Sequence, residues 1–256
     1  MYHEKGRIIL STGDLDLVSK CPYSITMARA INSARHCVRC NAFSEIARYC
    51  FSRAFRETNA ASDKRLKEKY NDILLGEGVG KEAREAMIRQ DSGILIDLLY
   101  LSREYKNNID QVEPEITINL GSFSIRDSLD AILCIKERYF IATFMCDDHP
   151  VDDRDMLGYQ VIAGSLWIRE NYSVEDNGVC LVRLRRAATP IMRYVDILPS
   201  TENLKSSIED SIKCLEFTSQ IKNEHEFQEY KIKLKQLSVR PGNINCLSHC
   251  SHCYKW

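Results

Sequence analysis

The sequence predicts an α/β protein in which a mixed sheet is flanked by helices and follows an N-terminal helical lobe. Two changes of pattern along the chain support this fold class. Apolar residues recur at three- and four-residue spacing in the first part of the chain and near its end, as in amphipathic helices. Between these parts, from residue 115, apolar residues alternate with polar ones or form short apolar runs, as in β-strands.

The elements are expected in a fixed order. Four helices are predicted at 23–36, 42–58, 62–75 and 79–106, and Pro114 ends this region. Three strands are predicted within 116–120, 129–135 and 139–144. An acidic loop follows at 147–153 and a helix at about 154–171. Two strands are predicted at 178–186 and 191–197, and a long helix at about 201–237. The predicted division is 1–110 for the helical lobe, 111–237 for the α/β core, and 238–256 for a cysteine-rich tail that docks on the lobe.

Composition indicates a globular protein without a global attraction to nucleic acid. The 256 residues are 44% hydrophobic, and 35 basic side chains nearly cancel 36 acidic ones. Any basic site must therefore be local. No apolar run approaches the roughly 20 residues that span a bilayer, and the N-terminus lacks a signal-peptide core. We expect no membrane partner and an intracellular, reducing, cytoplasmic location.

Eleven cysteines in a reducing compartment are expected to be buried or to bind metal. Burial is predicted for four that lie singly in apolar patterns: Cys50, Cys134, Cys180 and Cys214. A metal site is predicted from four others at the two ends of the chain: Cys21, Cys246, Cys250 and Cys253. One centre could thus join the termini. Three alternatives stay open: an iron–sulfur cluster, zinc, for which His249 and His252 are further ligands, and no metal.

Cys37 and Cys40, beside His36, form a second candidate pair of ligands. About one helical turn separates the two thiols, so the pair could replace ligands from the tail. Packing within the helical lobe is the favoured interpretation.

The middle of the chain resembles a family of nucleases. The segments 113–118 and 125–132, followed by a helix with Leu157-Gly158-Tyr159, are similar to the RecB-like branch of the PD-(D/E)XK nucleases. Cys21-Pro22 before the helices and three cysteines after the core are similar to the iron–sulfur members, the CRISPR-associated RecB-like exonucleases and AddB-type subunits. The resemblance spans residues 11–256 and implies a restriction-endonuclease-like core and a four-cysteine iron–sulfur cluster.

This resemblance also implies which residues would carry the chemistry. In the family, acids hold one or two Mg²⁺ ions and a lysine lies beside the attacking water. Asp130 falls on the first metal-binding aspartate, and Glu113 or Glu115 on the glutamate that precedes it. Thr143 stands where the second carboxylate belongs, and Met145 where the lysine belongs.

Two further positions of the family pattern are altered. No histidine lies near Gly80 on the upstream helix, and Asp155 replaces a glutamine four residues before the retained Tyr159, with Gln160 as the alternative in a shifted register. A neutral threonine and a methionine cannot bind Mg²⁺ or polarise water, so Mg²⁺ binding is expected to be weak and hydrolysis absent or very weak. Asp147 and Asp148, with Lys81 or Arg154, could supply displaced groups.

Nucleic-acid contact would rest on local arginines. Arg183 and Arg185 alternate with apolar residues, so they share one face of a predicted strand. The sequence thus predicts a nuclease-derived, catalytically inactive subunit that binds DNA or holds a protein partner in a DNA-processing complex. The alternatives are an active Mg²⁺-dependent exonuclease with relocated catalytic residues, and a structural subunit without nucleic-acid contact.

Overall fold

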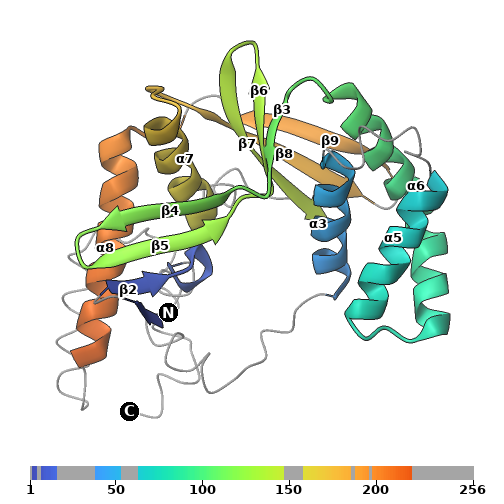
Figure 1. The fold of residues 1–256 in the computed structure, drawn as a ribbon, viewed down its shortest axis with the longest axis horizontal. Helices are drawn as coiled ribbons and strands as arrows, with labels where there is room; N and C mark the ends of the chain where they lie inside the picture. Colours follow the sequence, from blue (N-terminus) through green and yellow to red (C-terminus); the bar gives the residue numbers. More distant parts are fainter. Residues whose placement is uncertain are drawn as a thin grey trace.

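The computed structural model describes residues 2–4, 7–15, 38–52, 63–146, 158–185, 188–195 and 198–220. Two mixed sheets and the helices α3, α5, α6, α7 and α8 make up most of this part of the chain, and residues 12–15 form a further helical turn (Figure 1). None of the helices found there is both long enough and apolar enough to cross a membrane.

The first sheet has four strands in the order β1-β2-β5-β4. Their bounds are Tyr2–Glu4 for β1, Arg7–Leu10 for β2, Glu115–Leu120 for β4 and Phe123–Ser128 for β5. Strands β2 and β5 are parallel, and the other neighbours are antiparallel. The sequence did not predict β1 and β2, because strands of three and four residues are too short to establish a period.

The second sheet has five strands in the order β3-β6-β7-β8-β9. Their bounds are Ile109–Val112 for β3, Ala131–Ile135 for β6, Arg138–Cys146 for β7, Gly178–Arg185 for β8 and Ala188–Val195 for β9. Only β7 and β8 are parallel, and the chain between them includes helix α7.

A single antiparallel hairpin joins the two sheets. Strands β3 and β4 run against β6 and β5, and the pairs Val112–Ala131 and Glu115–Ser128 belong to one unbroken register. The Glu113 N–H donates to the Asp130 carbonyl and the Leu129 N–H to the Pro114 carbonyl, both at 3.1 Å. The ladder therefore continues while the hairpin bends from one sheet into the other at residues 113–114 and 129–130 (Figure 1).

Helices cover the second sheet on both faces, as expected. Helices α3 (Val38–Phe51), α5 (Asp63–Gly76) and α6 (Lys81–Glu104) agree with three of the four predicted N-terminal helices, and 23–36 lies outside the described residues. Helix α7 spans Tyr159–Asn171, and α8 spans Thr201–Gln220. The predicted extension of α8 to residue 237 is outside the described part.

The core confirms the predicted α/β class, although the structure has two mixed sheets where one was predicted. On one face of the second sheet, Leu133, Ala142 and Val182 pack in a cluster with residues of α3, α5 and α6. On the other face, Ile132 and Ile141 pack with α7, α8 and the first sheet. The helices of the predicted lobe therefore share a hydrophobic core with this sheet. The predicted division at residue 110 and the docked tail stay predictions, and residues 238–256 are not described.

Helix α7 lies unusually close to the bend of the hairpin. A Cβ atom on Gly164 would stand 2.8 Å from Leu129 Cδ2 and 2.9 Å from Ile141 Cδ1, both closer than real contacts allow. Glycine at this position thus lets the helix approach Leu129, which immediately precedes Asp130.

Candidate functional site

The Asp130 carboxylate lies at the bend of the hairpin. Asp130 immediately precedes β6 and is 7% exposed. Its Oδ2 accepts a hydrogen bond of 3.0 Å from the backbone N–H of Phe144 in β7. Continuing the register one residue beyond the Ala131–Ala142 pair brings Asp130 opposite Thr143. The two positions that the family resemblance related are therefore neighbours across the strands.

Arg48 of helix α3 reaches both carboxylates at the bend. Its Nη1 donates to Asp130 Oδ1 at 3.4 Å, and its Nε lies 3.1 Å from Glu113 Oε1. The buried Nε–H does not meet hydrogen-bond geometry with that oxygen, so the second contact is an ion pair only. The exposed fraction of the side chain is 9% for Asp130, 26% for Arg48 and 58% for Glu113. The Arg48 guanidinium thus lies between a buried carboxylate, that of Asp130, and a largely exposed one, that of Glu113.

The backbone at Glu113 is part of the same feature. Glu113 has a φ of 52°, in the left-handed region that is uncommon for residues other than glycine. The buried Pro114 follows it, and its ring fixes the next φ near the proline value. This pair of residues turns the strand out of the second sheet.

Burial raises the pKa of Asp130 above its ordinary value of 3.8. The Phe144 N–H and the positive charge of Arg48 act in the opposite direction, while the negative charge of Glu113 adds to the increase. Arg48 and the backbone amide therefore stabilise an ionised form that the surroundings otherwise disfavour.

A second arginine–aspartate pair fixes the helix that carries Arg48. Arg39 of α3 donates to both oxygens of Asp91 in α6, at 2.6 and 3.2 Å, and the Tyr70 hydroxyl of α5 donates to Asp91 at 3.1 Å. Asp91 is fully buried. Because three helices meet at one carboxylate, this cluster sets where α3 stands, and hence how Arg48 approaches the bend.

The other expected site residues fall into three groups. Thr143 is half-buried beside Asp130, whereas Glu115 is exposed on β4, beyond the bend. The hydroxyl of Tyr159 bonds to Ser211 and to the Ser207 carbonyl, so it connects α7 to α8. Met145 pairs with Arg183 in the backbone of β7 and β8, and their side chains are outside the described part, as is that of Arg185.

Two residues at the bend had no firm sequence signal. Gln160, only the alternative in a shifted register, donates through Nε2 to the Ser128 carbonyl at 2.8 Å, two residues before Asp130. Arg48 was not predicted, because no local pattern relates a helical arginine to a carboxylate 82 residues later.

The cysteines are described only in part. Cys50 and Cys180 are buried, as predicted, and burial raises the pKa of each thiol to about 12, so both stay protonated at neutral pH. Cys134 is half-buried, and the side chain of Cys214 is not described. The candidate ligands Cys21, Cys37, Cys246, Cys250 and Cys253, and the side chain of Cys40, also lie outside the described part. Among the residues described, no three His, Cys, Asp or Glu side chains group closely enough to hold a metal ion.

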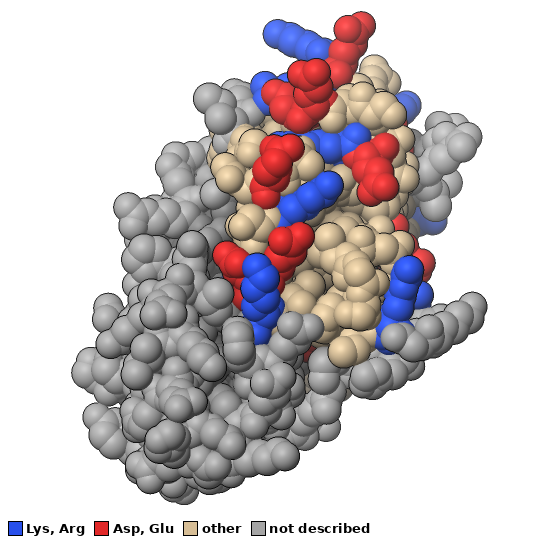
Figure 2. Space-filling model, turned by 90° about the vertical axis from the view of Figure 1, so that its left-hand side faces the viewer, with Lys and Arg blue, Asp and Glu red and all other residues tan. Residues whose placement is uncertain are grey.

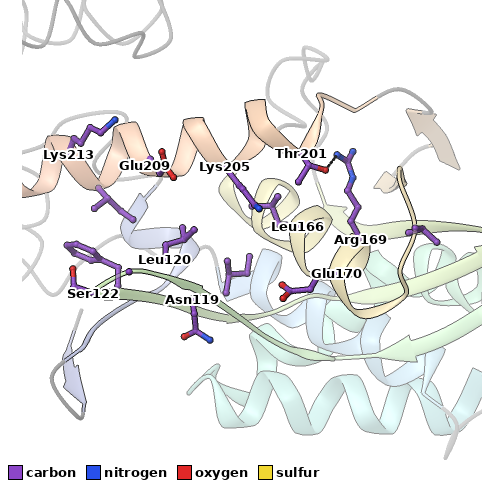
Figure 3. A pocket seen from close by; sticks show the side chains of 15 residues that line it. Asn119, Leu120, Ser122, Leu166, Arg169, Glu170, Thr201, Lys205, Glu209 and Lys213 are labelled. Carbon is purple, nitrogen blue, oxygen red and sulfur yellow. Dashed lines mark hydrogen bonds between the residues drawn. The ribbon is translucent and has the colours of Figure 1, made fainter.

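A groove of about 920 Å³ lies at the opposite end of β4 and β5 from the bend. The tip of the hairpin, α7 and α8 line it, with Lys205, Glu209 and Lys213 along α8 (Figure 3). Arg169 in its wall donates to Asn177, Thr201 and the Pro199 carbonyl. Figure 2 shows blue and red side chains interspersed among the described residues of the face on the left of Figure 1.

Taken together, fold and site define a mixed α/β protein with a carboxylate–arginine cluster where one hairpin passes between two sheets. Comparison with protein-family models gives no match, and no curated protein matches. Among solved structures, the protein SSO0001 is 15% identical, with 83% of this chain and 78% of that chain covered and a TM-score of 0.34. A candidate exonuclease from Eubacterium rectale is 14% identical, with coverage of 78% and 76% and a TM-score of 0.29. Similarity at this level does not identify a family.

The raised pKa of Asp130 predicts how stability depends on pH. A folded-state pKa above 3.8 means that the protonated carboxyl is favoured in the fold, so the contribution of Asp130 to stability is greatest below pH 3.8 and is lost as the pH rises through the folded value. Asp130→Asn keeps a neutral side chain at every pH. In urea unfolding from pH 3 to 7, we expect the wild-type chain to lose stability relative to Asp130→Asn as the pH rises, by about 1.4 kcal/mol per unit of pKa difference. A difference that is constant with pH would contradict this prediction.

Proposed function

We propose that the protein is a nuclease-derived module that does not hydrolyse DNA, and that it serves as a DNA-binding or scaffolding subunit of a DNA-processing complex. One observation supports this most directly: the guanidinium of Arg48 lies between Glu113 and Asp130. Resemblance to the PD-(D/E)XK nucleases puts an Mg²⁺ ligand at Asp130, and Glu113 is, with Glu115, one of the two candidates for the glutamate that precedes it. In this chain an arginine already pairs with both Asp130 and Glu113.

The chemistry of the other groups agrees with the proposal. Hydrolysis in that family needs a second carboxylate and a lysine to hold the metal and polarise water. Thr143 offers a hydroxyl beside Asp130, and Met145 cannot donate a proton or bind a hard cation. The Asp130 oxygens bond to the Phe144 N–H and to Arg48, which leaves its carboxylate fewer free lone pairs for a metal.

An active exonuclease with relocated groups is the first alternative. Its candidate residues Asp147, Asp148 and Arg154 lie outside the described residues, and Lys81 is exposed in the first turn of α6. A structural subunit without nucleic-acid contact is the second alternative. Cleavage distinguishes the first of these from our proposal, and binding of DNA distinguishes the second.

We further propose that Cys21, Cys246, Cys250 and Cys253 bind an iron–sulfur cluster, with zinc as the alternative. The support is the density of thiols near one end of the sequence and the Cys-Pro near the other. A shared centre would close a loop of most of the chain and so stabilise the fold. Its role would be structural.

The first functional prediction concerns cleavage. The wild-type protein, incubated with linear single- and double-stranded DNA and Mg²⁺ or Mn²⁺, should produce no more product than Asp130→Ala, because the site lacks a second carboxylate and a lysine. Gel analysis of end-labelled DNA measures this. Cleavage by the wild type that disappears in Asp130→Ala would contradict the proposal and favour the active exonuclease.

The second concerns DNA binding. If the module binds DNA through phosphates, log affinity should fall linearly with log salt, by about 0.9 for each phosphate neutralised, with little sequence preference. Arg183→Glu with Arg185→Glu should weaken binding to every DNA, as measured by fluorescence anisotropy. Lys64→Glu on α5 with Arg89→Glu on α6, both exposed, changes the net charge equally and serves as the control. Failure to bind any DNA at low salt would favour the structural subunit.

A further inference from the structure

We propose that Arg48 is a built-in cation at the bend of the hairpin, which occupies the place of a divalent ion between Glu113 and Asp130 and so keeps divalent ions out. The inference deepens the proposed function and rests on it in one respect, that Glu113 and Asp130 are former metal ligands. Arg48 would then have replaced the metal. The exclusion itself follows from the geometry of the three side chains.

Arg48 compensates the charge of the buried Asp130 carboxylate. Asp130 is almost wholly buried, and a buried carboxylate is costly unless a cation or hydrogen bonds compensate it. Arg48 provides the cation, and its lowering effect on the pKa of Asp130 opposes that of burial. The same guanidinium also neutralises part of the charge of Glu113. With both carboxylates ionised, Arg48 lowers the net charge of the three side chains from −2 to −1, so the cluster attracts a second cation less strongly.

Arg48 also stands too close to Asp130 to leave room for a second cation. A divalent ion bound to Asp130 Oδ1 would lie roughly 2.0–2.6 Å from that oxygen. Arg48 Nη1 stands 3.4 Å from the same oxygen. Both cations would then be within a few ångströms of each other in a partly buried place, where water screens repulsion weakly. Guanidinium and metal therefore exclude one another.

Arg48 also contacts its carboxylates at longer distance and with poorer geometry than Arg39, which lies in the same helix, contacts Asp91. Arg39 holds Asp91 in a two-pronged contact at 2.6 and 3.2 Å. Arg48 instead makes one long hydrogen bond to Asp130, and an ion pair to Glu113 whose N–H is not directed at the oxygen. This geometry is that of a counter-ion, which balances charge without fork-shaped recognition.

Binding of Mn²⁺ tests the inference, with the electron paramagnetic resonance signal of free Mn²⁺ as the readout. The wild type and Arg48→Lys, the control that keeps the charge, should both bind no more Mn²⁺ than Asp130→Asn. Arg48→Met has a side chain of similar bulk and no charge, and it should gain one site at least tenfold tighter than any in the wild type. Adding Asp130→Asn to Arg48→Met should remove that site.

Two results would overturn the inference. One is a Mn²⁺ site in the wild type that Asp130→Asn removes. The other is a folded Arg48→Met protein that gains no site.

If Arg48→Met does not fold, Glu113→Gln decides, because the mostly exposed side chain of Glu113 is readily replaced. Wild-type Mn²⁺ binding that Glu113→Gln weakens tenfold overturns the inference, and unchanged binding supports it. If the wild type binds Mn²⁺ at the bend but does not cleave DNA, only this inference is contradicted. If the wild type cleaves DNA at a site other than the bend, only the proposed function is contradicted.

Discussion

The buried negative charge of Asp130 has to be compensated inside the protein. The groups that compensate it belong to helix α3 and strand β7, and Asp130 itself lies where the two sheets join. The carboxylate lies where a continuous hairpin leaves one sheet for another. One of its oxygens is tied to β7 through the Phe144 N–H, and the other to α3 through Arg48. Strand and helix are therefore both positioned relative to the bend by a single side chain.

The consequences extend to both hydrophobic cores. Asp91 joins α3 to α5 and α6, so the three helices on one face of the second sheet are connected to the helix that carries Arg48. On the other face, Gly164 lets α7 pack directly on Leu129, the neighbour of Asp130. The bend is thus the point where two packed layers and two sheets depend on the same few residues. A cation at this place therefore supports the fold.

The sequence predicted those parts of the fold that have a strong local period. Helices α5 and α6 and strands β7, β8 and β9 lie close to their predicted ranges, because their apolar residues repeat over many positions. Strand β5 was missed, since Arg126, Asp127 and Ser128 interrupt its apolar pattern. Strand β3 was missed because it holds only four residues, two of them polar.

The candidate site was predicted in part. The neighbourhood of Asp130, Thr143 and Glu113 follows from the strand order, which the sequence implied through its resemblance to a nuclease family. Arg48 could not be predicted, since its partners lie on a distant part of the chain and ion pairs leave no periodic signal. The retained Tyr159 bonds through its hydroxyl to α8, whereas Gln160, the alternative in a shifted register, bonds to the Ser128 carbonyl near the bend. The roles of the cysteines and of Arg183 and Arg185 stay predictions.

The central claim is that Arg48 balances the buried charge of Asp130. A double-mutant cycle of Arg48→Met and Asp130→Asn, measured by urea unfolding at pH 7, tests it most directly. Each single change removes one charge, and the double change removes both, so the cycle isolates the interaction of the pair. We expect a coupling free energy of about 1–3 kcal/mol, as for other contacting charged residues. Additive effects, within roughly 0.3–0.5 kcal/mol, would contradict the claim.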